Sequence, residues 1–261
     1  MTLLEAIILG IIQGLAEFLP ISSSGHLALG QVLFGIDDNN MAFNIVVHVG
    51  TLVPVVIVYR KDIWELIKRP FQKMTFLLIT ATIPAVIVAV FFDDAIEAAF
   101  SSLSFLAVGF VITGFVLILT DKFRKNHKKS DEISYLDALL IGIAQGIAVF
   151  PGISRSGSTI AASLSRGIVR EDAAKFAFLM SIPAILGALL LQIVSVISGE
   201  ILLEELNFIN LGAGLVSAML SGYLAINFML AAIKKAKLSY FAYYVIILAV
   251  AIIVGLFIYG F

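Results

Sequence analysis

The chain has 261 residues, of which 61% are hydrophobic and 13% charged, with a formal net charge of −1 and a mean hydropathy of +1.07. Soluble globular proteins contain about 45–50% apolar and about 25% charged residues, so this composition excludes a soluble domain. The sequence contains no cysteine, which excludes disulfides, thiolate metal ligands and thiol nucleophiles. Its apolar runs are continuous rather than alternating, as in helices and not as in barrel strands. We therefore predict an all-α polytopic membrane protein with a single membrane domain over residues 1–261.

The first apolar segment, Leu3–Phe18, predicts a helix that is too short to cross a membrane. Sixteen residues rise about 24 Å, whereas the hydrocarbon core is about 30 Å thick. Pro20 and a serine cluster interrupt the segment, and a shorter helix is expected at Leu27–Phe34. The two pieces predict a re-entrant hairpin that enters and leaves on one side. Irregular backbone at membrane depth is tolerated only where protein or water covers it, which suits an active-site cavity.

The remaining segments repeat this plan. Transmembrane helices are expected at residues 42–59, 74–92 and 103–120, separated by a polar loop (Asp37–Asn40), a basic loop (Arg60–Lys73) and an acidic loop (Asp93–Glu97). A charged linker, 122–134, follows. The second half begins with a short helix (Tyr135–Phe150), an interruption at Pro151-Gly152, a further short helix (Ser156–Ser165) and transmembrane helices at 173–197, 208–232 and 239–259.

The two halves share polar residues at a fixed offset of 132 positions. Gly10, Gln13, Gly14, Phe18, Ser22, Ser24 and Gly25 recur as Gly142, Gln145, Gly146, Phe150, Ser154, Ser156 and Gly157. We therefore predict internal repeats at 1–121 and 135–261. Each repeat holds one hairpin and three transmembrane helices, and because three is odd the repeats must have opposite orientations. Inverted repeats with broken helices place their sites near the membrane midplane.

The basic residues test this topology independently. Sixteen of the 17 lysines and arginines lie in Arg60–Lys73, Lys122–Lys129, Arg166–Lys175 and Lys234–Lys237, which the topology puts on one face. The opposite face carries only acidic charge: Glu5, Asp37, Asp38, Asp93, Asp94, Glu97, Glu200, Glu204 and Glu205. By the positive-inside rule the basic loops are cytoplasmic. The two termini and the mouth of the first hairpin are then expected outside the cytoplasm. The one basic residue outside these four segments is Arg155, which lies in the second hairpin.

The interruptions of the two hairpins carry unusual polar chemistry. Gln13 and Glu17 are spaced i, i+4 on one helix face. Serine clusters at Ser22–Ser24 and Ser154–Ser158 have N-cap character. Two helix N-termini meeting at depth would form an anion site, to which Arg155 adds a planar donor fork suited to phosphate.

Each of these residues also has a simpler explanation. Serines at helix starts commonly serve only as caps, Glu17 and Arg155 could form a structural ion pair, and a histidine in a membrane is often only a hydrogen-bonded structural residue. The set as a whole, with His26 and many hydroxyls in two repeat-related loops, favours a functional site.

The two motifs resemble those of the undecaprenyl-diphosphate phosphatase family, also called bacitracin-resistance proteins. Gln13-Gly-Leu-Ala-Glu17, running on to Pro20-Ile-Ser-Ser-Ser-Gly-His26, is similar to the family's (Glu/Gln)-x-x-x-Glu motif with its downstream histidine. Pro151-Gly-Ile-Ser-Arg-Ser-Gly-Ser-Thr159 is similar to its Pro-Gly-x-Ser-Arg-Ser-x-x-Thr motif. Gln13 stands where many members have glutamate, which removes one metal ligand.

The resemblance implies hydrolysis of a polyprenyl diphosphate to the monophosphate and inorganic phosphate, at the outer face of the cell membrane. It implies Glu17, Ser23, His26 and Arg155 as catalytic residues, supported by Gln13, Ser22, Ser24, Ser154, Ser156 and Thr159. The nucleophile is either Ser23 or a water activated by a metal or by His26. In this hypothesis His26 handles protons, and Glu17 either orients it or binds Mg²⁺ or Ca²⁺.

The implied partners are the polyprenyl lipid and the surrounding membrane lipids, with no nucleic acid. A homodimer and a monomer both stay open. The alternative function is a transporter or flippase that moves a lipid phosphate or small anion without hydrolysis, because paired re-entrant hairpins are also transporter architecture.

Overall fold

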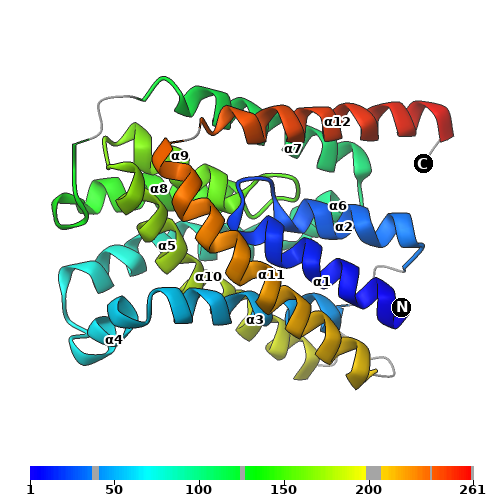
Figure 1. The fold of residues 1–261 in the computed structure, drawn as a ribbon, viewed down its shortest axis with the longest axis horizontal. Coiled ribbons are helices and arrows are strands. Elements are labelled where there is room, and N and C mark those ends of the chain that lie inside the picture. Colours follow the sequence, from blue (N-terminus) through cyan, green and yellow to red (C-terminus); the bar gives the residue numbers. More distant parts are fainter. Residues whose placement is uncertain (37–40, 124–126, 198–206, 236, 260–261) are drawn as a thin grey trace.

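The computed structural model describes residues 1–261 except 37–40, 124–126, 198–206, 236 and 260–261, and the regular secondary structure of the described part is almost entirely helical (Figure 1). Its β-structure there is limited to one isolated bridge between Lys128 and Ile168. The helices are α1 (Leu3–Phe18), α2 (Ser23–Phe34), α3 (Met41–Val58), α4 (Arg60–Lys68), α5 (Lys73–Phe91), α6 (Asp93–Phe100), α7 (Leu103–Thr120), α8 (Tyr135–Ile147), α9 (Arg155–Ser165), α10 (Arg170–Ile197), α11 (Phe208–Lys235) and α12 (Ser239–Tyr259). A 3₁₀ turn, Ser130–Glu132, precedes α8.

Five of these helices, α5, α7, α10, α11 and α12, are long and apolar enough to cross a membrane. A sixth span is available if α3 is counted together with α4, which bends away from it by 86°. The six predicted transmembrane segments thus each coincide with a helix, and the coarse prediction of an all-α polytopic membrane protein is confirmed.

Both predicted hairpins are present as pairs of short helices, α1 with α2 and α8 with α9. α1 has the predicted limits, but α2 begins at Ser23, four residues before the predicted start, because Ser22 already caps it: the Ser22 Oγ accepts from the Gly25 N–H at 3.4 Å. α8 ends at Ile147 rather than Phe150, and the chain then turns through Pro151 and Gly152. Gly152 has a φ of +82°, a conformation that glycine adopts without strain.

Two segments predicted as charged loops are helical. The basic segment Arg60–Lys73 contains α4, and the acidic segment that starts at Asp93 forms α6. The loop predictions failed because the charges suit the helix dipole: Asp62 lies in the first turn of α4 and Lys68 in its last, while Asp93 and Asp94 open α6. Other predictions concern residues outside the described ranges, namely the loop Asp37–Asn40, the acidic residues Glu200, Glu204 and Glu205, and the linker residues Arg124 and Lys125.

The repeated glycines let each hairpin pack closely on a long helix. α1 lies alongside α11 (Figure 1), where a Cβ added to Gly14 would stand 2.4 Å from the Ala218 carbonyl oxygen. α8 lies along α5, where a Cβ on Gly142 would stand 2.5 Å from the Ala81 carbonyl oxygen. Small residues at such contacts allow helix backbones to approach, which drives helix association in lipid. The packing fixes the position and rotation of each hairpin against its long helix.

The base of the second hairpin is held by a buried carboxylate. Asp137, in the first turn of α8, is completely buried and accepts from Arg166 Nε at 2.7 Å and from Lys128 Nζ at 3.1 Å. Its backbone N–H is capped in return by the Ser134 hydroxyl. These contacts join the start of α8, the end of α9 and the preceding linker. The hairpin is therefore anchored at its mouth as well as along α5.

Candidate functional site

The tips of the two hairpins are in contact, as the repeat-related motifs predicted. The Ser156 hydroxyl donates to the Leu19 carbonyl oxygen at 3.0 Å, although the two residues are 137 positions apart. A Cβ added to Gly25 would lie 3.1 Å from the Gly152 Cα, so the glycines of the two motifs sit against each other. The two polar interruptions therefore form one continuous region between α1, α2 and α9.

Glu17 stands at the centre of this region with its side chain 2% exposed. One carboxylate oxygen accepts an ion-paired hydrogen bond from Arg155 Nη2. The other accepts from Gln13 Nε2 at 3.0 Å and from the Ser23 hydroxyl at 2.5 Å. Three of the predicted site residues, Gln13, Ser23 and Arg155, thus converge from both motifs on the carboxylate of a fourth, Glu17.

Arg155 approaches Glu17 from the first residue of α9. Its second terminal nitrogen, Nη1, donates to the Ser181 carbonyl oxygen of α10 at 3.4 Å. The side chain is 22% exposed, so the guanidinium is only partly covered. A planar guanidinium held in this way keeps further N–H donors available for phosphate oxygens.

Serine side chains cap both short helices that start at the tips. Ser22 caps α2, and Ser154 caps α9 by accepting from the Gly157 N–H at 3.1 Å. Ser24 and Ser156 lie beside these caps, with Oγ–Oγ distances of 3.4 Å to Ser22 and 3.3 Å to Ser154. The predicted caps are confirmed. The first turns of both helices, with their unpaired N–H groups and partial positive charge, border the region that holds Glu17 and Arg155.

Thr159 lies in the same helix but faces its own backbone. Its hydroxyl donates to the Arg155 carbonyl oxygen at 2.8 Å, and the residue is 1% exposed. In this arrangement it rigidifies the first turn of α9. Its predicted role as a substrate ligand stays a prediction.

His26 is placed differently from the hypothesis that Glu17 orients it. Its Nδ1 lies 2.8 Å from the Ser22 carbonyl oxygen and its Nε2 lies 2.8 Å from the Tyr244 hydroxyl of α12. Both ring nitrogens therefore have partners other than Glu17. Tyr244 carried no signal in the sequence, because it lies in an apolar helix beside two other tyrosines, Tyr240 and Tyr243.

Thr113 is a second residue that the sequence did not single out. It is 2% exposed in α7, and its hydroxyl donates to the Gly152 carbonyl oxygen at 2.8 Å while accepting from the Ser154 N–H at 2.9 Å. One hydroxyl thus satisfies two backbone groups of the second hairpin tip. Beside it, a Cβ on Gly109 would stand 2.2 Å from the Pro151 carbonyl oxygen. α7 is therefore the surface on which the Arg155 loop rests.

Two residues with side-chain oxygen atoms, Glu17 and Gln13, could hold a divalent cation. Within the described ranges no three His, Cys, Asp or Glu side chains gather as a ready-made metal centre. Gln13 Oε1, however, is buried without a hydrogen-bond partner, in the amide whose Nε2 contacts Glu17. Mg²⁺ is commonly bound through one or two carboxylates together with substrate phosphates. The donor set of Glu17 and Gln13 fits a cation of that kind, completed by a phosphorylated ligand.

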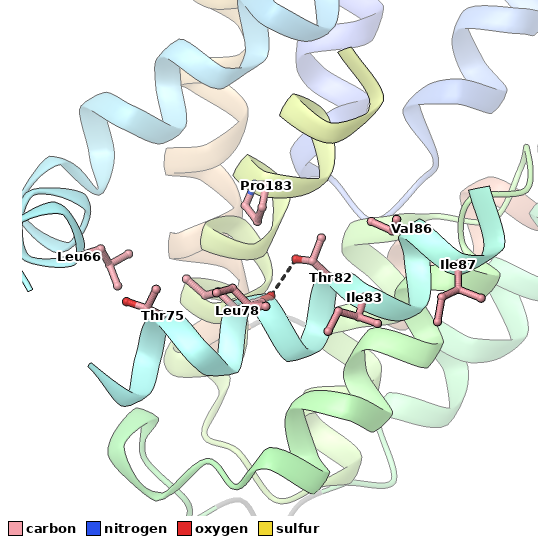
Figure 2. A pocket seen from close by; sticks show the side chains of 9 residues that line it. Leu66, Thr75, Leu78, Thr82, Ile83, Val86, Ile87 and Pro183 are labelled. Carbon is pink, nitrogen blue, oxygen red and sulfur yellow. Dashed lines mark hydrogen bonds between the residues drawn. The ribbon is translucent and has the colours of Figure 1, made fainter. Parts of the chain in front are cut away.

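A groove of about 470 Å³ lies elsewhere, between α4, α5 and α10 (Figure 2). Its lining is almost wholly apolar, and its residues are Leu66, Thr75, Leu78, Ile79, Thr82, Ile83, Val86, Ile87 and Pro183. The Thr82 hydroxyl is used within α5, donating to the Leu78 carbonyl oxygen at 2.7 Å. The groove has no charged side chain for an anion, so it is suited to hydrocarbon and not to the chemistry at Glu17.

Comparison with known proteins agrees with the motifs. The family model "Bacitracin resistance protein BacA" matches residues 6–251. The chain is 46% identical over 250 residues to a Carboxydothermus hydrogenoformans protein named "Undecaprenyl-diphosphatase", with 96% of each chain covered. It is 47% identical over 245 residues to "Undecaprenyl-diphosphatase 3" of Bacillus cereus, covering 94% of each. A Halothermothrix orenii "Undecaprenyl-diphosphatase" is 42% identical over 256 residues, with 97% of this chain and 98% of the relative covered.

Proposed function

The chain belongs to the bacitracin resistance protein BacA family, and on this premise we propose that it hydrolyses undecaprenyl diphosphate to the monophosphate and inorganic phosphate. This reaction recycles the lipid carrier for cell-wall glycan synthesis and confers bacitracin resistance, in keeping with the name of the family. The observation that carries the proposal is the carboxylate of Glu17, which holds both the Ser23 hydroxyl at 2.5 Å and the Arg155 guanidinium. In the proposed mechanism Glu17 is the base, Ser23 the nucleophile and Arg155 the phosphate-binding group, and the contacts among their side chains support these roles.

Binding begins with the diphosphate at the tips of the two hairpins. The Arg155 guanidinium exchanges part of its contact with Glu17 for the phosphate oxygens, and the capped first turns of α2 and α9 add backbone N–H groups. Phosphoryl transfer needs positioning and neutralisation of the developing charge more than it needs covalent help. The expected contribution of Arg155 is accordingly large, about 10²–10³-fold in rate.

Ser23 is the nucleophile in this proposal. Its Oγ attacks the terminal phosphorus, the bond from that phosphorus to the bridging oxygen breaks, and the lipid monophosphate leaves. Glu17 accepts the Ser23 proton, since its oxygen already receives that hydrogen bond. A water molecule then attacks the phosphoserine, which releases inorganic phosphate and restores the serine. The competing route is direct attack by a water that Glu17 deprotonates.

The other site residues support these steps. His26 handles protons during the reaction, as the resemblance to the family implies. Gln13 holds Glu17 in place, and Ser22, Ser24, Ser154 and Ser156 shape the two helix starts that receive the diphosphate. A divalent cation, Mg²⁺ or Ca²⁺, would be held by Glu17, Gln13 Oε1 and the diphosphate, and it would neutralise phosphate charge.

We also propose the inverted-repeat architecture and its orientation in the cell membrane. The halves 1–121 and 135–261 would lie in opposite orientations about the linker 122–134, with the basic segments cytoplasmic and the site open to the outer face. The chain lacks cysteine, so a single introduced cysteine reports one position. Asp93→Cys, at the start of α6, should react with an impermeant maleimide in intact cells, and Lys129→Cys should not. The reverse pattern would overturn the orientation.

The hydrolase is distinguished from a transporter or flippase by its product. Purified protein in detergent is incubated with undecaprenyl diphosphate, with and without EDTA, and inorganic phosphate is measured. We expect release that EDTA abolishes and that added Mg²⁺ or Ca²⁺ restores. Binding of the lipid with no phosphate released under any metal condition would contradict hydrolysis and favour the transporter alternative.

A further inference from the structure

The ring of His26 is fixed at both nitrogens by groups from different parts of the chain. Nδ1 lies 2.8 Å from the carbonyl oxygen of Ser22, one turn earlier, and Nε2 lies 2.8 Å from the Tyr244 hydroxyl, 218 positions away. Tyr244 stacks on the imidazole with ring centroids 5.5 Å apart and planes 14° apart. Phe110 meets the same ring edge-on at 5.2 Å. The imidazole has little freedom to rotate between these contacts.

The contacts also determine which nitrogen of His26 carries the proton. A carbonyl oxygen only accepts hydrogen bonds, so Nδ1 must be the donor to Ser22. Neutral His26 therefore has an unprotonated Nε2, which accepts from the Tyr244 hydroxyl. Ser22 holds its carbonyl in place with a φ of +69°, a left-handed conformation that costs a non-glycine residue free energy. The strained residue, Ser22, is therefore the one whose carbonyl oxygen fixes the tautomer of His26.

A phenolic hydroxyl suits the changing state of Nε2. It donates to the lone pair of neutral histidine and, after a half-turn of its O–H bond, accepts from Nε2–H of the protonated ring. Phe110 contributes no polar atom, and the Ser22 carbonyl accepts from Nδ1–H in both states. Tyr244 is thus the single polar side chain, among the contacts described for the ring, that can follow proton uptake at Nε2 without losing its hydrogen bond.

We propose that Tyr244 is a positioning residue for His26 in the phosphatase reaction. Its hydroxyl keeps the imidazole in the Nδ1–H tautomer. Because that hydroxyl occupies the single lone pair of Nε2, a proton reaches Nε2 by transfer from Tyr244, which takes up a proton in exchange from a water that links it to the reacting groups. The inference rests on the proposed function, because it assigns His26 a proton-transfer role in hydrolysis. Through Tyr244, helix α12 contributes to the reaction, although that helix contains neither hairpin motif.

The test measures kcat and KM for phosphate release by Tyr244→Phe, which keeps the stacked ring and removes only the hydroxyl. We expect kcat to fall roughly tenfold and KM to stay nearly unchanged, because Tyr244 acts through His26 and not on the lipid. Tyr243→Phe is the matched control: the neighbouring tyrosine of α12 is 58% exposed, and its variant should behave as the unmodified protein.

A second comparison separates positioning from packing. In a His26→Ala background, which should retain slow release, adding Tyr244→Phe should cause no further loss, because the residue through which Tyr244 acts is gone. An equal loss in both backgrounds would overturn the inference. So would a Tyr244→Phe variant with unchanged kcat beside a Tyr244→Leu variant that is impaired, since only the ring would then matter. Absence of phosphate release by the unmodified protein would instead refute the proposed function.

Discussion

Arg155 and Glu17 are 138 positions apart in the chain and form an ion pair at the contact between the two hairpin tips. Glu17 comes from the end of α1 and Arg155 from the start of α9. The ion pair can therefore form only when both hairpins are in the positions described above. Because Glu17 is almost fully buried, either residue left without the other is costly.

The first prediction concerns the stability of this pair. Arg155→Ala and Glu17→Ala should each destabilise the protein by about 3–5 kcal/mol, whereas the double variant should lose clearly less than the sum. Thermal midpoints in detergent measure this. Lys175→Ala is the control, because the Lys175–Asp62 pair is one-third exposed on both sides and should contribute about 0–1 kcal/mol. Strictly additive losses at Glu17 and Arg155 would show that the two residues are not coupled.

Trapping of a covalent intermediate tests Ser23 as the nucleophile. Acid quenching during turnover, followed by mass spectrometry, should find phosphate on the peptide that carries Ser23. Ser23→Ala should lose both this adduct and at least about 10³-fold in kcat. Ser165→Ala, which alters an exposed hydroxyl at the end of α9, should be unaffected. A Ser23→Ala protein with near-normal turnover would instead assign the attack to a water activated by Glu17.

Thr113 should matter through the loop that it supports. Thr113→Val keeps the shape of the side chain but leaves the Gly152 carbonyl and the Ser154 N–H without their hydrogen-bond partner. The loss should lower the free energy of unfolding by about 1–3 kcal/mol. Turnover should fall severalfold as well, since Arg155 follows Ser154 directly. Thr82→Val, whose hydroxyl bonds only within its own helix, should change both quantities little. Equal effects of the two variants would argue against a special role of Thr113.

Gln13 should control the response to divalent metal. Gln13→Glu places a second carboxylate one turn from Glu17, and a cation would relieve the repulsion between them. We expect half-maximal activity at a severalfold lower Mg²⁺ concentration, measured by titrating metal into EDTA-treated protein. Gln13→Leu should shift the titration the other way, because it removes the orphaned amide oxygen. An unchanged titration for both variants would place the metal away from Gln13.

Much of this site followed from local sequence signals. Ser22 and Ser154 predicted the helix starts, and Pro20 and Pro151 predicted the interruptions. The shared offset of 132 positions indicated that the two motifs belong to one site. The meeting of Glu17 with Arg155 could be predicted because unpaired charge is too costly to bury at depth. These signals depend on residue type and spacing, which the sequence displays directly.

The unpredicted residues depend on packing instead. Tyr244 reaches His26 only because α12 lies along α7, and nothing in its apolar surroundings distinguishes it from Tyr243. Thr113 is one hydroxyl in an apolar helix, and its two backbone partners become visible only once the second hairpin rests on α7. Such contacts arise between helices that have no common sequence motif.

The proposed phosphatase site depends on Glu17 and Arg155 acting together, although they come from separate hairpins. The most direct test is phosphate release from undecaprenyl diphosphate by purified Glu17→Gln and Arg155→Lys, compared with Glu65→Gln and Arg69→Lys in and after the exposed helix α4. We expect a loss of about 10²–10³-fold or more in kcat/KM for the first two variants and none for the second two. Folded Glu17→Gln and Arg155→Lys proteins that release phosphate at the unmodified rate would contradict it.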